Sequence, residues 1–141
     1  MKKIEFNKIE LGAELTPITK KITQETINRY GEAAGDYNPI HVDVEYAKTG
    51  PFKGTIAHGL MSLAYISELM ARDFSQGWFF GGKVEMRFRA PIRPGDTITI
   101  KGKVIEKKSE GEKNLIVCEV LCENQEGKAV IIANTTAQCL N

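Results

Sequence analysis

The chain contains one long stretch in which apolar residues occupy most positions, residues 58–73: His58-Gly59-Leu60-Met61-Ser62-Leu63-Ala64-Tyr65-Ile66-Ser67-Glu68-Leu69-Met70-Ala71-Arg72-Asp73. Drawn as a helix, its apolar residues cover most of the circumference; they are Leu60, Met61, Leu63, Ala64, Tyr65, Ile66, Leu69 and Met70. A helix that is apolar nearly all round is normally buried. The stretch therefore predicts a long core helix enclosed by the rest of the chain.

The residues that follow this helix have the pattern of strands. Val84, Met86 and Phe88 alternate with charged residues, which is the period of a β-strand. Three more strands are expected at residues 97–106, 114–123 and 129–140, and Pro94-Gly95 fits a type II turn. One buried helix followed by an antiparallel meander predicts an α+β fold in which a curved antiparallel sheet wraps around the helix.

The residues that precede the long helix predict smaller elements. Residues up to about 20 have room for a short strand, and residues 23–34 have helical spacing with Thr23 as N-cap and Gly35 at the C-terminus. One short helical turn is expected at residues 44–48. No repeat or linker divides the chain, so residues 1–141 are expected to form a single domain.

The composition excludes several classes of protein. The chain has 19 Lys+Arg and 18 Asp+Glu, so it lacks the positive charge of a dedicated nucleic-acid binder. No run approaches the roughly 20 apolar residues of a membrane span, and the start does not resemble a signal peptide. The three cysteines, Cys118, Cys122 and Cys139, are expected to be reduced core thiols in a cytoplasmic protein.

Residues suited to acid–base chemistry gather at Gly35-Asp36-Tyr37-Asn38-Pro39-Ile40-His41-Val42-Asp43. A carboxylate and an imidazole that share one water can remove a proton and return one near neutral pH. Asn38-Pro39 disfavours a helix between Asp36 and His41, so a tight turn or irregular loop is expected there. A structural reading stays open, because Asp before Asn-Pro often only forms a turn.

Other chemistries find less support in the sequence. His41, Asp43 and His58 are candidate metal ligands, but no third close histidine, His-x-x-Glu-His array or carboxylate cage accompanies them, so no bound metal is expected. The chain also has no Gly-x-Ser-x-Gly elbow and no glycine-rich nucleotide motif.

Gly59 opens the long helix, where the first N–H groups lack partners and carry the positive end of the dipole. Such an N–H can polarise a carbonyl oxygen, although the glycine can equally serve close packing alone. His58 is expected to be a structural or capping residue. Ser62 and Ser67 are expected to bond back to the helix backbone, unless one of them orients Asp36 or His41.

A set of residues in a fixed order links these features: Tyr30, Gly35-Asp36-x-Asn38-Pro39-Ile40-His41-x-Asp43, Ala47, Phe52 and Ile56-Ala57-His58-Gly59. With residues 84–88 and 91–96, this set resembles the MaoC-like hydratases, which include the (R)-specific enoyl-CoA hydratases and adopt the hot-dog fold. The resemblance covers essentially the whole chain. Ala34 departs from it, because relatives commonly have a small hydroxyl residue there.

The resemblance implies roles for individual residues. Asp36 and His41 match the pair that holds one water, and the Gly59 N–H matches the donor to the thioester carbonyl. Asn38 would shape the loop, and Ser67 would be a supporting serine. The reaction would need no metal or redox cofactor, since coenzyme A or a phosphopantetheine arm is part of the substrate. Candidates for the wall of the acyl pocket are Phe52, Met61 and Tyr65.

The resemblance also implies a homodimer in which two sheets continue across a two-fold interface. Arg87, Arg89 and Arg93 are then candidates for binding coenzyme A phosphates. Three alternatives to an (R)-specific enoyl-CoA hydratase stay open: a 3-hydroxyacyl dehydratase acting on acyl carrier protein, a non-catalytic thioester-binding subunit of a hetero-oligomer, and a hot-dog thioesterase.

Overall fold

The structure, a computed structural model, describes residues 4–140; residues 1–3 and 141 of the predicted domain lie outside the described residues. Its five strands form one sheet in the order β1-β3-β4-β5-β2, and every neighbouring pair is antiparallel. The strands are β1 (Ile18–Lys21), β2 (Lys83–Phe88), β3 (Thr97–Glu110), β4 (Lys113–Glu123) and β5 (Ala129–Cys139). The helices are α1 (Gln24–Ala34), α2 (Pro39–Val42), α3 (Val44–Lys48), α4 (Gly59–Phe74) and α5 (Gln76–Gly81).

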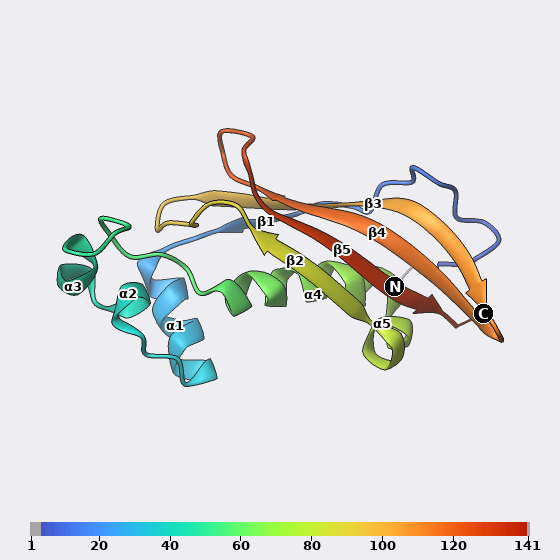
Figure 1. Ribbon diagram of the computed structural model, residues 1–141, viewed down its shortest axis with the longest axis horizontal. Helices are drawn as coiled ribbons and strands as arrows, with labels where there is room; N and C mark the ends of the chain where they lie inside the picture. The colour runs from blue at the N-terminus through green and yellow to red at the C-terminus, as the bar shows by residue number, and fades with distance from the viewer. Residues whose placement is uncertain (1–3, 141) are drawn as a thin grey trace.

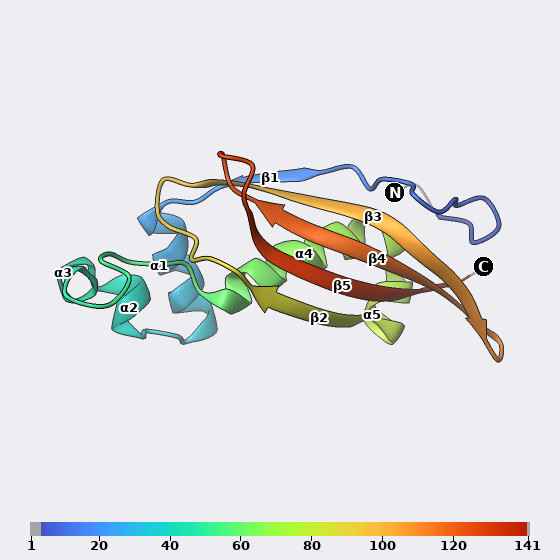
Figure 2. The same cartoon turned by 45° about the horizontal axis from the view of Figure 1, so that its top comes forward.

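The sheet curves over α4, the predicted long helix, and the two layers enclose the core (Figures 1 and 2). Ile66, Leu69 and Met70 of α4 are fully buried, and so are Ile100 and Val120 of the sheet. Because the helix has one apolar side against the sheet, its burial drives the packing of the two layers. The predicted α+β class is confirmed.

The prediction that α4 is enclosed on nearly all sides is wrong. Leu60 is 64% exposed, and Ala64 and Glu68, which follow it at helical spacing, are exposed as well. The sheet covers only one side of the helix, and this stripe lies on the other. The apolar content of a helix does not reveal which of its faces the same chain covers.

Helix α1 begins and ends where the sequence predicts. Thr23 is the N-cap and forms a capping box with Thr26, which satisfies two backbone N–H groups that would otherwise lack partners. Gly35 follows the helix in the left-handed region, with φ of +73°. Glycine adopts this conformation without strain, so the chain leaves the helix sharply and delivers Asp36 into the next loop.

The prediction of an irregular loop between Asp36 and His41 is partly wrong, because residues 39–42 form the short helix α2. Pro39 occupies its first position, where the missing N–H has no partner in any helix. Asn38 precedes the proline with non-helical φ −54° and ψ 124°, and its side chain accepts a hydrogen bond from the Ile40 N–H at 3.2 Å. The restriction before proline thus acts on the N-cap and leaves the helix free to form. The predicted turn at residues 44–48 is confirmed as α3.

Sequence patterns did not predict α5. In this helix Gly77 lies against the Gln138 backbone so closely that any side chain would collide with it. Trp78 is buried, and its Nε1–H donates to Ser67 Oγ of α4 at 2.8 Å. These contacts fix α5 between α4 and β5, although its own sequence is short and rich in glycine.

The four later strands are confirmed, with β3 reaching Glu110 rather than residue 106. The type II turn is confirmed too, because the Asp96 N–H bonds the Arg93 carbonyl at 3.0 Å and Gly95 has φ of +97°. Cys118 and Cys122 are both fully buried, as expected. Within residues 4–140 no helix is long and apolar enough to cross a membrane.

Candidate active site

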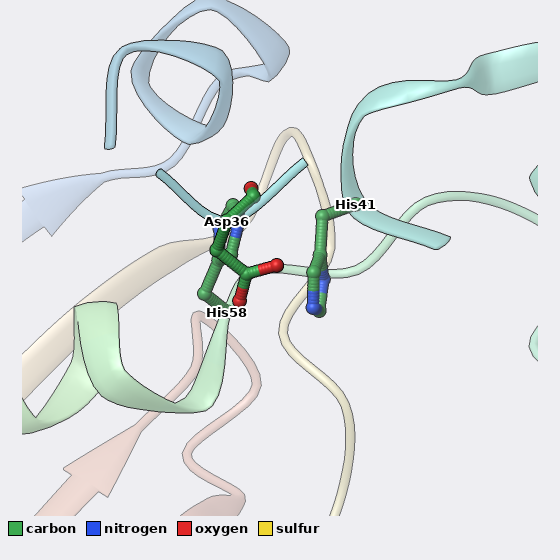
Figure 3. A group of neighbouring side chains, drawn as sticks. All are labelled: Asp36, His41 and His58. Atoms are coloured by element: carbon green, nitrogen blue, oxygen red, sulfur yellow. Dashed lines mark hydrogen bonds between the residues drawn. The ribbon is translucent and has the colours of Figure 1, made fainter. Parts of the chain in front are cut away.

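Three side chains from three segments meet at the N-terminal end of α4. Asp36 comes from the loop after α1, His41 from α2, and His58 from the residue before α4. One potential ligand atom from each lies within 4.8 Å of the other two. Figure 3 shows one carboxylate oxygen of Asp36 pointing toward the His41 ring. Asp36 is exposed, whereas His41 and His58 are buried.

The hydrogen bonds of His41 determine its tautomer. Its Nδ1 lies 2.7 Å from the carbonyl oxygen of Ile56. A carbonyl only accepts, so Nδ1 carries the proton and Nε2 of the neutral ring has a free lone pair. The backbone of the same residue is held as well, because Gln24 Nε2 donates to the His41 carbonyl at 2.8 Å. His41 is therefore held through one ring nitrogen and its backbone carbonyl, and Nε2 is available as a base.

The loop around Asp36 holds its backbone and leaves part of its carboxylate available. The Asp36 N–H bonds the Gly31 carbonyl at 2.9 Å, and Oδ1 accepts from the Asn38 N–H at 3.2 Å. Asn38 in turn caps α2. The expectation that Asn38 shapes the loop is thus confirmed.

A cavity of about 460 Å³ opens beside His41. Its walls are mostly apolar and include Phe52, Ile56, Phe88, Ile92 and Ile131; Gly59, Ser62 and Arg89 also line it. Gly59 is the first residue of α4, and the N-cap His58 makes no side-chain capping bond there. Among residues 4–140 no acceptor for the Gly59 N–H is present, so this donor is available to a group in the cavity.

Of the three residues predicted for the acyl pocket, only Phe52 lines the cavity. Met61 is buried in the core. Tyr65 packs near Lys20, whose Nζ is 5.2 Å from the ring centroid, and burial raises the pKa of Tyr65. Helical position decided these outcomes, since residues 61 and 65 point away from the direction of residues 59 and 62.

Ser67 has a different partner from the one expected. It accepts the hydrogen bond of Trp78 and does not line the cavity, so the structure gives it no contact with Asp36 or His41. Ser62 lines the cavity instead, although the family resemblance pointed to Ser67 as the supporting serine. Its spacing of three from Gly59 was the available signal, because residues i and i+3 share a helix face.

The residues expected as possible metal ligands are not all brought together. Asp43 caps α3 through the Tyr46 N–H at 3.0 Å, and Asp36 joins His41 and His58 in its place. One carboxylate with two imidazoles has the composition of some zinc sites. The expectation that no metal is bound stays a prediction.

Comparison with known proteins gives this site a family. The model of the MaoC like domain matches residues 7–125. An (R)-specific enoyl-CoA hydratase of Rhodospirillum rubrum is 35% identical over 107 residues, which are 73% of this chain and 74% of that protein. A 3-hydroxybutyryl-CoA dehydratase of Methylorubrum extorquens is 33% identical over 114 residues, 80% of this chain and 71% of that protein.

A solved structure agrees with these sequence matches. The unliganded R-hydratase of Pseudomonas aeruginosa superimposes with a TM-score of 0.82 and 29% identity, over 97% of this chain and 86% of the other. The expected hot-dog fold is confirmed. The family match covers most of the chain, including the loop of Asp36 and His41 and the start of α4, and the chain therefore belongs to the MaoC-like dehydratase family.

Proposed function

We propose that this protein is a hydro-lyase that reversibly adds water to a trans-2-enoyl-CoA and forms an (R)-3-hydroxyacyl-CoA. The observation that carries the proposal is that the Asp36 carboxylate and the His41 ring lie together beside an apolar cavity that also contains the Gly59 N–H. The names of the relatives in Rhodospirillum rubrum and Methylorubrum extorquens support a coenzyme A thioester as substrate.

In the hydration direction one water is held between Asp36 and His41. His41 is the group that accepts a proton in this scheme, because Nδ1–H is bonded to Ile56 and the neutral ring then has its lone pair on Nε2. The water oxygen bonds to C3 while the electron pair of the double bond moves toward the thioester carbonyl. The proton that leaves the water passes to the pair, and a proton from the pair reaches C2. The pair thus ends the cycle with the protons it had at the start.

The Gly59 N–H donates to the carbonyl oxygen on which this negative charge develops. It lies at the start of the 16-residue helix α4, where the helix dipole favours negative charge. A fixed donor of this kind is worth about 10²–10³ in kcat. Ser62 lines the same cavity one helical turn later and places a hydroxyl beside the reacting end of the substrate.

The remainder of the cavity suits an acyl chain. Phe52, Ile56 and Ile131 provide apolar walls, so burial of the chain contributes to binding. Arg89 lines the cavity, and Arg87 and Arg93 are near Arg89 in the sequence. These three side chains are our candidates for binding the coenzyme A phosphates. No metal or redox cofactor takes part in this scheme.

A homodimer would cover the apolar surface that one chain leaves exposed. Strand β2 is at one edge of the sheet, and Phe88 at its end is 60% exposed. Phe79 and Phe80 of α5 and Leu60 of α4 are also exposed. A second copy paired along β2 would bury these side chains and complete the ladder of the edge strand. Light scattering of the wild-type protein tests this arrangement.

The catalytic proposal is tested with purified protein and crotonyl-CoA, by following loss of the absorbance of the conjugated thioester. We expect turnover to the (R) alcohol, and a loss of about 10²–10⁴ in kcat for Asp36→Asn and for His41→Ala. Asp43→Asn is the matched control, since Asp43 lies in the same segment but only caps α3, and asparagine caps equally well. Dialysis against EDTA is expected to leave the rate unchanged.

Three results would change the assignment. Turnover only with enoyl groups on acyl carrier protein would identify the dehydratase of fatty-acid synthesis. Free coenzyme A as the main product would identify a thioesterase. Binding without turnover of either substrate, restored only by a second chain, would identify a non-catalytic subunit.

A further inference from the structure

We propose that His58 is a positioning residue that fixes Asp36 and His41 relative to each other, through one hydrogen bond and one ring contact. The proposed function gives His58 no chemical role, yet it is 1% exposed and touches both members of the pair. This inference rests on the proposed function for its kinetic consequences, but its structural part can be tested separately.

The hydrogen bond joins His58 to the backbone of Asp36. His58 Nε2 lies 3.0 Å from the Asp36 carbonyl oxygen, and because a carbonyl only accepts, Nε2 carries the proton. The Asp36 N–H is bonded to Gly31 at 2.9 Å. The N–H and the carbonyl of Asp36 are therefore both hydrogen-bonded, although its side chain is exposed. The bond to the N–H comes from the backbone of Gly31, and the bond to the carbonyl comes from the side chain of His58.

The ring contact joins His58 to His41. Their ring centroids are 4.0 Å apart with an angle of 30° between the planes. The centroid of the Tyr30 ring lies 4.9 Å from that of His58. The bond to Ile56 fixes one nitrogen of His41 but leaves rotation about that bond. The flat face of His58 limits this rotation, so the direction of His41 Nε2 is fixed by two neighbours.

The unused nitrogen of His58 argues against a role in packing alone. With the proton on Nε2, Nδ1 is an acceptor, and it is the one buried side-chain N or O among residues 4–140 without a hydrogen-bond partner. A buried polar atom without a partner lowers stability. A phenylalanine would fill the same space without this cost, but it would not hold the Asp36 carbonyl.

The surroundings are shaped for this contact. A Cβ on Gly31 would lie 2.8 Å from the backbone carbonyl oxygen of Asp36 and 3.3 Å from His58 Nε2, so only glycine lets α1 approach both groups. His58 also directly precedes Gly59, the proposed donor to the thioester. One buried ring thus connects the backbone of Asp36, the ring of His41 and the start of α4.

Two substitutions separate the two contacts. His58→Phe keeps a ring against His41 and loses the bond to Asp36, whereas His58→Gln keeps an N–H donor near the position of Nε2 and loses the ring. We expect kcat for crotonyl-CoA hydration to fall about tenfold or more in His58→Phe and about threefold in His58→Gln, with KM little changed, because displacement of a catalytic group costs turnover. Ile66→Val is the control: it removes a methylene from the core of α4, far along the helix, and should lower Tm without lowering kcat.

The second measurement does not depend on turnover. The chain has two histidines, so the imidazole ¹⁵N signals that disappear in His58→Phe belong to His58 and those that remain belong to His41. We expect His41 as the Nδ1–H tautomer and His58 as the Nε2–H tautomer in the wild type. His58→Phe should shift the backbone resonances of Asp36, and His58→Gln should shift those of the His41 ring.

The outcomes distinguish this inference from the proposed function. Spectra as expected with no turnover of any enoyl thioester would overturn the function and keep His58 as the residue that holds the loop. Turnover in the wild type with kcat within twofold of it in both His58 variants would overturn the positioning role. The same conclusion follows if kcat in the His58 variants and in Ile66→Val only follows their loss of Tm.

Discussion

The phenyl ring of Phe88 lies directly over Gly59: a Cβ on Gly59 would be 2.8 Å from Cζ of that ring. The end of the edge strand β2 thus packs on the first residue of α4, and both residues line the cavity. Close packing, one of the two roles that the sequence allowed for Gly59, is therefore confirmed. The same lack of a side chain leaves the Gly59 N–H open to the cavity, and the two roles require different experiments.

Replacing Gly59 by proline or by alanine separates the donor from the packing. Proline removes the N–H but suits the first position of a helix, and His58, with φ −61° and ψ 139°, already has the conformation of a residue before proline. We expect Gly59→Ala to lower kcat/KM for crotonyl-CoA moderately. Gly59→Pro should lower it by about a further 10²–10³, the value of one donor to the developing charge.

The alanine variant has an internal control. The three atoms nearest to its Cβ all belong to the Phe88 ring, so Phe88→Leu in the same chain should restore part of the activity of Gly59→Ala and none of that of Gly59→Pro. Equal activities of the alanine and proline variants would show that the Gly59 N–H does not contribute.

Gly31→Ala should impair the enzyme although alanine is the better helix former. In an open helix the change would gain about 1 kcal/mol. Here the new Cβ would be 2.8 Å from the Asp36 carbonyl oxygen, a backbone atom that must move. We expect no gain in the free energy of unfolding, measured in urea, and a fall in kcat of about tenfold. Gly50→Ala is the matched control, because its Cβ makes only an ordinary contact at 3.5 Å; a stabilised and fully active Gly31→Ala would contradict the packing described here.

Ser67→Ala should affect stability rather than catalysis. The change removes the acceptor of Trp78 Nε1–H and leaves a buried donor without a partner, which costs roughly 1–3 kcal/mol. The chain has one tryptophan, so its fluorescence reports this site, and urea unfolding gives the energy. A lower kcat at unchanged stability would instead support the role that the family resemblance implied for Ser67.

The buried thiols should make the protein less stable in alkali. Burial raises the pKa of Cys118 and of Cys122 from 9.0 to about 12. Above pH 9 the unfolded chain therefore loses protons that the folded chain keeps, so the free energy of unfolding decreases as pH rises from 9 toward 12. Two such groups contribute a slope of roughly 3 kcal/mol per pH unit. The slope should be smaller in a Cys118→Ala, Cys122→Ala variant, and equal slopes in the two proteins would refute this origin.

Local signals sufficed where neighbouring residues determine the structure. Thr23 and Gly35 set the ends of α1 through their own hydrogen bonds and backbone angles. A loop was expected at residues 39–42, but they form α2, because proline restricts the backbone of the preceding residue, Asn38, and fits the first position of a helix. Helix α5 was not predicted because its stability depends on Ser67 and Gln138, which are distant in sequence.

The sequence by itself determined the fold class, the family and the identity of Asp36, His41 and Gly59 as candidates. These features follow from periodicity, capping and the order of residues along the chain, which are local properties. Tertiary structure alone decided the tautomer of His41, the contacts of His58 with Asp36 and His41, and the preference for Ser62 over Ser67 at the cavity. Each of these depends on contacts between segments that are separated in sequence, and their distances and directions are fixed only when the sheet packs on α4.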